Sequence, residues 1–332
     1  MAPMTESIDL TIDVTDAAGL GEPLSTKATV TLPDPATMSE PPVVCFGFPG
    51  GGYSRQYFTF DMPKGFGDIV DDAGGGQAGW HARRGWIFVS CDHLLVGESS
   101  APSDPEALGF GVVAAANAAT VAGVLAALGD GSLADGFTAV ADPVVLGIGQ
   151  SMGGCFTIVQ QGLLGTYAGI GVLGYSGLHT TLAFPPGTEA GVDAVFTPRE
   201  DGLPLTTWGF HYDDEPADMV DRDMRDYPTR GGDVPVWGSA TMPPCATVML
   251  DPGCVADEAA AITVPVFVGV GERDVCPDPR AEPPAYAQSP DITVFVCPRM
   301  SHMHNFASTR EQFWDRLQTW GEGVARAATA RA

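Results

Sequence analysis

Ser151 has neighbours that suit a nucleophile. It stands in the pattern G-Q-S-M-G at residues 149–153, directly after an apolar run and directly before a predicted helix. Small residues two positions before and two positions after the serine allow a sharp, strained turn that presents its Oγ at the carboxyl end of a strand. The serine then also lies at a helix N-terminus, whose free N–H groups and dipole favour a developing oxyanion. The pattern therefore predicts a nucleophilic serine.

With the apolar strand and the helix on either side, this pattern resembles the nucleophile turn of the α/β-hydrolase superfamily, of the esterase and lipase kind. Residues 91–99 (C-D-H-L-L-V-G-E-S) are similar to the D-x-x-G-x-G-x-S loop that follows the family's fourth strand. The resemblance covers most of residues 40–177 and 262–332. It implies a serine hydrolase with the chain order Ser, then Asp or Glu, then His, and it requires no cofactor.

A serine hydroxyl is a weak nucleophile until a base takes its proton, and the base needs a third group that fixes its tautomer. Residues 266–274 (V-F-V-G-V-G-E-R-D) are similar to the family's acid-bearing loop, which makes Asp274 the expected acid and Asp278 the alternative. His302 follows the last apolar run in the family's P-x-x-x-H spacing and is the expected base. His304 is the alternative base.

The oxyanion formed by attack on a carbonyl group needs N–H donors. In the family one donor is the residue after the nucleophile, here Met152, and another comes from the loop after the third strand. That loop, residues 48–55 (F-P-G-G-G-Y-S-R), resembles the HGGG type with a proline in place of the histidine. Gly51 is the first candidate for the second donor and Gly52 the next, whereas alignment with the shorter H-G-x loop makes Phe48 the donor.

The elements that must position these residues follow from the apolar pattern. Near-continuous runs rich in Val, Ile and Phe predict strands covered on both faces, at residues 43–48, 86–91, 144–149, 169–174, 264–270 and 292–296. Predicted helices at 106–128, 152–164 and 306–329 lie between several of them. Alternating residues at 7–14 and 26–32 predict an antiparallel pair at one sheet edge. The fold class is therefore α/β, a doubly wound and mostly parallel sheet, and the resemblance makes it the α/β-hydrolase fold.

Residues 178–262 interrupt this alternation, because they are rich in Pro, Asp and aromatic residues. We interpret them as a cap inserted into a core formed by residues 1–177 and 263–332, where it would cover the site. The acidic residues of the cap are expected to form a solvated face: Asp213, Asp214, Glu215, Asp218, Asp221, Asp223 and Asp226.

Composition excludes several classes of partner. Asp plus Glu total 41 against 16 Lys plus Arg, a net charge of −25, and no run of basic residues occurs. We therefore expect no nucleic-acid binding and no docking on an anionic membrane. Residues 107–129 carry no charge, and glycines and polar residues within them favour a helix buried against the sheet over a membrane span. The first ten residues lack the features of a secretory signal, so a cytoplasmic location is expected.

The 7 cysteines are an odd number without C-x-x-C spacing, and they mostly lie in apolar runs, which favours buried free thiols. A bridge between Cys245 and Cys254 is the alternative. His302 and His304 could also bind a metal, but no further ligand is suitably spaced, so no metal is expected.

The sequence thus predicts a serine hydrolase that cleaves a carboxylic ester through an acyl-enzyme. The aromatic residues of the cap favour an apolar or mixed small-molecule substrate. A thioesterase, a lactonase, a C–C bond hydrolase or a cofactor-free haloperoxidase would use the same residues. A ligand-binding protein without catalytic activity is a further alternative.

Overall fold

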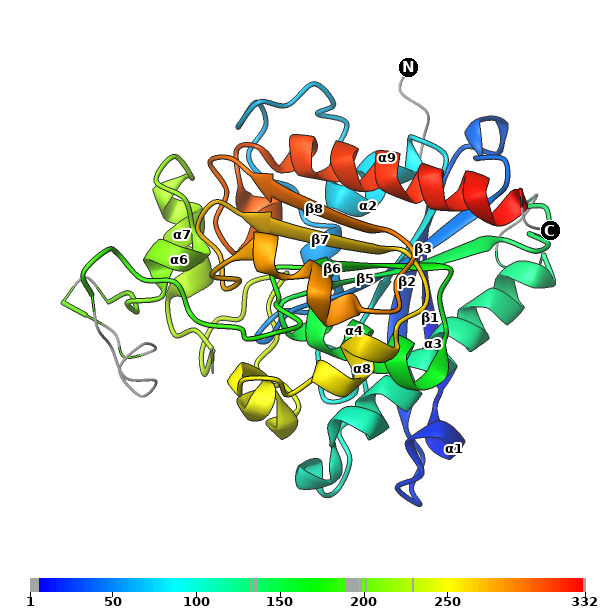
Figure 1. Ribbon diagram of the computed structural model, residues 1–332, viewed down its shortest axis with the longest axis horizontal. Coiled ribbons are helices and arrows are strands. Elements are labelled where there is room, and N and C mark those ends of the chain that lie inside the picture. Colours follow the sequence, from blue (N-terminus) through cyan, green and yellow to red (C-terminus); the bar gives the residue numbers. More distant parts are fainter. Residues whose placement is uncertain are drawn as a thin grey trace.

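An eight-stranded sheet runs through the part of the chain that the structure describes (Figure 1). The computed structural model describes residues 6–131, 133, 137–188, 197, 199–200, 202–228 and 230–330. The strands are β1 (Glu6–Asp13), β2 (Ser25–Leu32), β3 (Val43–Phe48), β4 (Ile87–Cys91), β5 (Val144–Gln150), β6 (Gly169–Leu173), β7 (Val266–Gly271) and β8 (Ile292–Cys297). Their spatial order is β1-β2-β4-β3-β5-β6-β7-β8. The pairs β1/β2 and β2/β4 are antiparallel and the others are parallel.

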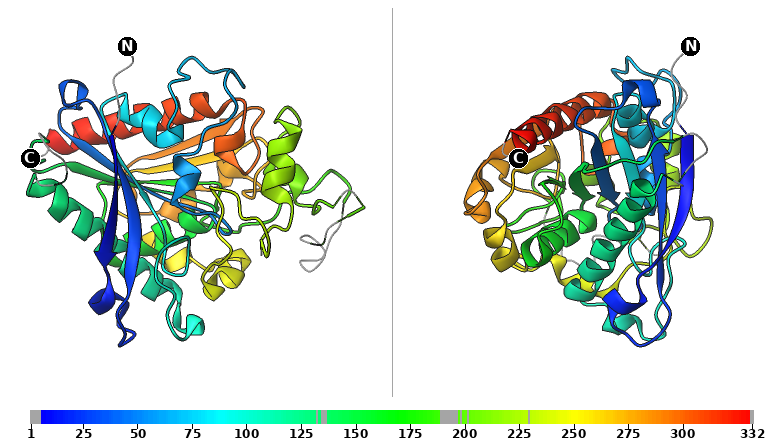
Figure 2. Two further views of the ribbon diagram at one scale, coloured as in Figure 1. Left: turned by 180° about the vertical axis from the view of Figure 1, so that it is seen from behind. Right: turned by 90° about the vertical axis from the view of Figure 1, so that its right-hand side faces the viewer.

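Helices cover both faces of this sheet (Figure 2). The α-helices of the described residues are α1 (Thr15–Ala18), α2 (Gly76–Ala82), α3 (Phe110–Gly129), α4 (Met152–Leu164), α6 (Thr207–Phe210), α7 (Ala217–Met224), α8 (Ala256–Ala261) and α9 (Arg310–Thr329). Short 3-10 helices are η1 (Pro35–Thr37), η2 (Arg55–Phe58), η3 (Pro105–Ala107), η4 (Pro244–Leu250), η5 (Pro279–Ala281), η6 (Pro283–Tyr286) and η7 (His304–Phe306). Helices α3, α4 and α8 pack with the apolar side chains of one face, and α2 and α9 with those of the other. The predicted doubly wound, mostly parallel sheet is confirmed.

The predicted strands lie within two residues of the observed ones, but one expectation about them is wrong. Strand β8 is not covered on both faces, since most of its residues are only half-buried and Val296 is 44% exposed. It is the last strand of the sheet and has a neighbour on one side only. An apolar run therefore does not distinguish an edge strand from a central one.

Helix α3 corresponds to the predicted buried helix. Its length and composition alone would allow it to cross a membrane. In the structure it packs against β1, β2, α1 and α4. Thr120 lies 2.6 Å from the hydroxyl of Thr26 on β2, and Asn117 hydrogen-bonds His93. These contacts with the sheet are those of a core helix.

All seven cysteines are free in the structure. Five are buried, whereas Cys245 and Cys254 are half-buried and form no disulfide with each other.

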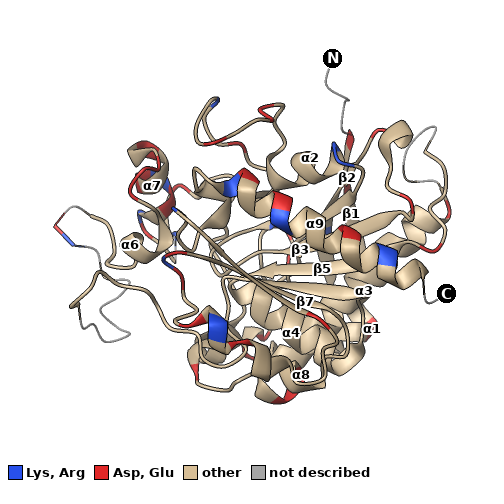
Figure 3. Ribbon diagram, turned by 45° about the horizontal axis from the view of Figure 1, so that its top comes forward, with Lys and Arg blue, Asp and Glu red and all other residues tan. Residues whose placement is uncertain are grey.

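The interval between β6 and β7 contains α6, α7, η4 and α8. Helices α6 and α7 lie beyond the carboxyl ends of the strands (Figure 1), whereas α8 packs against α4. The division into core and cap remains a prediction. The expectation of a uniformly solvated acidic face is wrong for Glu215 and Asp223, which are buried, although α7 does carry acidic residues (Figure 3).

Candidate active site

The turn at Ser151 has the conformation that the sequence predicts. Strand β5 ends at Gln150, α4 begins at Met152, and Ser151 between them has φ 54° and ψ −118°. This backbone conformation is strained for a residue with a side chain. A Cβ on Gly149 would lie 2.0 Å from the carbonyl oxygen of Gly153, and a Cβ on Gly153 would lie 2.1 Å from that of Phe48. Only glycine fits at both positions, so the turn requires a glycine on each side of Ser151.

The structure brings Ser151, His302 and Asp274 into one chain of hydrogen bonds. The three residues follow β5, β8 and β7, whose carboxyl ends meet at the same edge of the sheet. The Nε2 of His302 lies 2.9 Å from the Oγ of Ser151, and its Nδ1 lies 2.7 Å from the Oδ1 of Asp274. Both His302 and Asp274 are buried. A base within hydrogen-bond distance of a serine, oriented by a carboxylate, can take the proton from the hydroxyl.

The carboxylate of Asp274 is held in its charged form. Oδ1 accepts the N–H of Val275 at 2.7 Å, and Oδ2 accepts the N–H of Gly271 at 2.7 Å. Burial alone would raise the pKa of Asp274, but the facing His302 and His304 outweigh burial and hold the pKa below its usual range. Because a charged carboxylate only accepts hydrogen bonds, Nδ1 of His302 must carry the proton. Its Nε2 then has the free electron pair that faces Ser151.

The two alternative candidates do not reach the serine in this way. His304 is buried behind the acid, where its Nε2 lies 2.7 Å from the Oδ2 of Asp274. Its Nδ1 makes no hydrogen bond with any described residue. Asp278, the alternative acid, accepts the N–H of Arg280 at 3.2 Å and caps η5. The geometry thus places His302 beside Ser151 and Asp274 beside His302.

Each carbonyl group in the turn at residues 49–52 accepts a hydrogen bond. The pairs are His93 Nε2 with Pro49 O at 3.2 Å, Tyr53 N–H with Gly50 O at 3.2 Å, the Tyr227 hydroxyl with Gly51 O at 2.9 Å, and Ser239 N–H with Gly52 O at 2.9 Å. Within the described part of the chain, the N–H groups of Gly51, Gly52 and Met152 donate to no acceptor. Occupied carbonyls and free N–H groups are what an anion site requires.

The glycine turn that holds the predicted donor Gly51 lies close to the serine. A Cβ on Gly50 would lie 3.0 Å from the Cβ of Ser151, and Gly51 lines the same cavity as Ser151. Phe48 is fully buried in β3, and its ring stacks on His93 with the centroids 5.3 Å apart. The structure therefore places Gly51, and not Phe48, in the wall of the cavity. Burial lowers the pKa of His93 to about 4, so this histidine is neutral and supports the turn.

Ser151 and His302 open into a cavity of about 230 Å³. Most of its lining residues come from the interval 178–262, and they are largely apolar: Leu182, Phe210, Tyr227, Pro228, Met242, Pro243, Pro244, Ala246, Met249 and Leu250. Among the described residues, no Asp, Glu, Lys or Arg lines it. The cavity suits a neutral, apolar group placed next to the serine.

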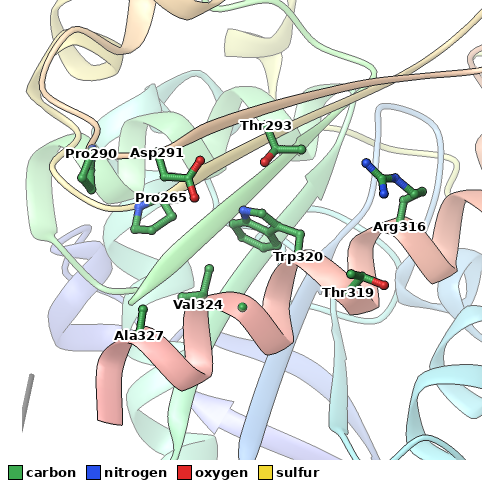
Figure 4. A pocket seen from close by; sticks show the side chains of 10 residues that line it. Pro265, Pro290, Asp291, Thr293, Arg316, Thr319, Trp320, Val324 and Ala327 are labelled. Carbon is green, nitrogen blue, oxygen red and sulfur yellow. The ribbon is translucent and has the colours of Figure 1, made fainter. Parts of the chain in front are cut away.

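A larger depression of about 530 Å³ lies elsewhere, between α9 and the starts of β7 and β8 (Figure 4). Its lining includes Asp291, Arg316 and Trp320, but no serine, cysteine or histidine of the part of the chain that the structure describes. It also lies at the amino ends of parallel strands, away from the edge where sites form in open α/β sheets. Among the described residues, no three His, Cys, Asp or Glu side chains gather as a metal site would require.

Two contacts of the site were not predicted from the sequence. They are the bond from Tyr227 to the carbonyl of Gly51 and the bond from His304 to Asp274. Tyr227 is 176 residues from Gly51 in the chain and stands in no motif, so no local signal marks it. The sequence shows that His302 and His304 are two residues apart, but it does not show that both contact the carboxylate of Asp274.

Comparison with known proteins identifies the fold. No family model and no curated protein matches the chain. Among solved structures, it is similar to proline iminopeptidase from Mycobacterium smegmatis, at 16% identity and a TM-score of 0.60, over 96% of this chain and 99% of that one. A lipase in its open form matches at 18% identity and 0.59, over 97% and 99% of the two chains. A peroxisomal alpha-beta-hydrolase from Saccharomyces cerevisiae matches at 12% identity and 0.56, over 98% and 89%. The chain has the α/β-hydrolase fold.

Proposed function

We propose that this protein is a serine hydrolase that cleaves a carboxylic ester. The observation that carries the proposal is the hydrogen-bonded chain from Ser151 Oγ to His302 at 2.9 Å and from His302 to Asp274 at 2.7 Å. It lies in the wall of an apolar cavity and beside N–H groups that are free to bind an anion.

In the first half of the proposed reaction, Ser151 Oγ attacks the carbonyl carbon while Nε2 of His302 takes the hydroxyl proton. Asp274 stabilises the imidazolium that forms. The N–H groups of Met152 and of Gly51 or Gly52 bind the oxyanion of the tetrahedral intermediate. The intermediate collapses, the bond to the alcohol oxygen breaks, and His302 gives its proton to the departing alcohol. An acyl group then remains on Ser151.

In the second half, water replaces the alcohol. His302 takes a proton from the water, whose oxygen attacks the acyl carbon, and the same N–H groups bind the second oxyanion. When this intermediate collapses, the bond to Ser151 breaks and His302 returns the proton to Oγ. The products are an alcohol and a carboxylic acid, and no cofactor takes part.

The cavity defines the substrate class that we propose. An apolar cavity of about 150 Å³ in another protein holds benzene, so the 230 Å³ here would hold a somewhat larger group. An unpaired charge would lose its hydration against the apolar lining. The substrate is therefore expected to carry a neutral acyl or alcohol group of roughly four to eight carbons. The interval 178–262 would act as the cap that encloses it.

A panel of p-nitrophenyl esters tests this function. We expect kcat/KM to pass through a maximum between the butanoate and the octanoate. We also expect the negatively charged hemisuccinate to be at least about tenfold poorer than the butanoate of matched length. Ser151→Ala should lower turnover by more than about 1000-fold. Absence of hydrolysis across the panel by wild-type protein would contradict the proposal.

A further inference from the structure

The turn at residues 50–53 is conformationally free in isolation, because three of its residues are glycines. The N–H of Tyr53 bonds to Gly50 O at 3.2 Å, and Gly52 has φ +78°. A positive φ at this third position is typical of a type II turn, whereas a type I turn has a negative φ there. The two forms differ by a flip of the central peptide, between Gly51 and Gly52. Glycine permits both forms.

One side chain holds that central peptide. The hydroxyl of Tyr227 donates to the carbonyl oxygen of Gly51 at 2.9 Å. Because the carbonyl and the N–H of a trans peptide point in opposite directions, this bond also fixes the direction of the Gly52 N–H. The preceding peptide is fixed by the bond from Tyr53 to Gly50. Both peptides that flank Gly51 are therefore held.

Tyr227 is itself held by the segment that surrounds it. The edge of its ring meets Phe210 at a centroid distance of 5.3 Å, and the guanidinium of Arg230 lies 5.3 Å from its ring centroid. Arg230 also lies over the ring of Tyr53 at 5.1 Å and bonds to the buried Asp223 at 3.1 Å. These contacts limit the movement of the Tyr227 ring and so preorganise its hydroxyl.

Burial keeps Tyr227 a hydrogen-bond donor. Burial raises the pKa of Tyr227, so the hydroxyl is protonated at neutral pH. Burial alone would raise the pKa of Asp223, but His211 and Arg230 outweigh burial and lower the pKa, which keeps the carboxylate charged. The same carboxylate accepts the Tyr53 hydroxyl at 2.5 Å. Tyr53 therefore contacts the carboxylate of Asp223 directly, and Tyr227 is connected to the same carboxylate through Arg230.

We propose that Tyr227 is a positioning residue for the oxyanion donors: its hydroxyl holds the Gly51–Gly52 peptide in the orientation in which the turn can bind an oxyanion. This inference rests on the proposed function and extends it. It means that residues between β6 and β7 both line the cavity and complete the catalytic geometry of the core. The hydroxyl contributes to transition-state binding and leaves ground-state binding unchanged.

Tyr227→Phe is the test, because it removes the hydroxyl and keeps the ring in the cavity wall. Active sites are titrated with a fluorophosphonate, and kcat is expressed per titrated site. A misfolded fraction of the protein then does not lower the kcat value. We expect kcat to fall by about 5- to 30-fold while KM changes by less than about twofold. The inhibition constant of an alkyl boronic acid, whose adduct with the serine is tetrahedral, should rise by the same factor. The inhibition constant of an alcohol with the same alkyl chain, which forms no tetrahedral adduct, should not change.

Tyr212→Phe is the matched control. This tyrosine belongs to the same interval, its hydroxyl lies 3.3 Å from Glu272, and it does not line the cavity. It should keep wild-type kcat. The inference is overturned if kcat of Tyr227→Phe stays within twofold of wild type, or if boronic acid and alcohol weaken equally, as loss of cavity shape would cause. If wild-type protein takes no fluorophosphonate, the proposed function fails and the inference with it. If wild type is labelled and Tyr227→Phe behaves like it, only the inference fails.

Discussion

His304 meets the Oδ2 of Asp274 at 2.7 Å, the same distance at which His302 meets the Oδ1. The two histidines thus flank one carboxylate, although they stand only two residues apart in the chain. Only His302 also reaches Ser151. His304 packs its ring against Phe313 at a centroid distance of 4.6 Å. His302 therefore joins the serine to the acid, whereas, among the described residues, the Nε2 of His304 contacts only the acid.

This arrangement predicts unequal effects of the two histidines on turnover. His302→Ala should lower kcat/KM by more than about 1000-fold, because the base is lost. His304→Phe removes one hydrogen bond to Asp274 and keeps a flat ring against Phe313. It should lower kcat/KM by no more than about tenfold and reduce stability by about 1–3 kcal/mol. Steady-state kinetics measure kcat/KM of the two variants, and urea unfolding measures their stability. A larger kinetic loss in His304→Phe than in His302→Ala would reverse the assignment.

The turn at Ser151 predicts a strong steric effect at Gly149. Ala at this position would place a Cβ 2.0 Å from the carbonyl oxygen of Gly153. We expect Gly149→Ala to cost more than about 3 kcal/mol of unfolding free energy or to prevent folding. Gly111→Ala is the control, since a Cβ there meets nothing within 4 Å and the residue lies in α3. Because Gly111 is the second residue of the helix, where propensity counts less than in the interior, this change should raise the unfolding free energy by no more than about 1 kcal/mol. Urea unfolding measures the unfolding free energies of the two variants. Equal values would refute the steric argument.

Leu182 lines the cavity and offers a way to enlarge it. Leu182→Ala removes three carbon atoms from the lining. The preferred acyl chain should therefore lengthen by about two to three carbons in a p-nitrophenyl ester series. Leu178→Ala makes the same chemical change in the same segment, at a residue that is 42% exposed and outside the cavity lining. That variant should keep the wild-type optimum. An optimum that moves in neither variant would show that the acyl group lies elsewhere.

His211 predicts a pH-dependent part of the stability. Burial alone would lower the pKa of His211, but the facing Glu215 and Asp223 outweigh burial and raise the pKa to about 9. Protonated His211 stabilises the fold. This stabilisation is fully present at pH values below about 6.5, the pKa in the unfolded chain, and it is lost as the pH rises through about 9. His211→Gln should therefore cost roughly 3 kcal/mol at pH 6 and much less above pH 9. Urea unfolding across this range measures the difference, which would be constant with pH if the histidine were neutral in the folded protein.

The parts of the site that could be predicted from sequence are those fixed by local geometry. The turn at Ser151 depends on glycines within two residues of it, so a five-residue pattern is enough. Asp274 and His302 follow strands that apolar runs mark, and the resemblance gives their order in the chain. The side of Asp274 to which each histidine bonds depends on the path of the loop after β8, which no pattern of residue types encodes.

The parts that could not be predicted depend on packing between distant segments. Tyr227 reaches Gly51 across 176 residues. Asp223 and Glu215 have the composition of a solvated face, yet both are buried because His211 lies between their carboxylates. Strand β8 has the composition of a central strand, and its place at the sheet edge follows from topology alone.

The central claim is that Ser151 is a nucleophile activated by His302. The most direct measurement is the intact mass of wild-type protein and of Ser151→Ala after incubation with a fluorophosphonate. The probe phosphonylates a serine only where a base takes its proton and N–H groups stabilise the developing charge. The account predicts one adduct per wild-type chain and none on Ser151→Ala. An unlabelled wild-type chain, or a variant labelled as fast as wild type, would contradict it.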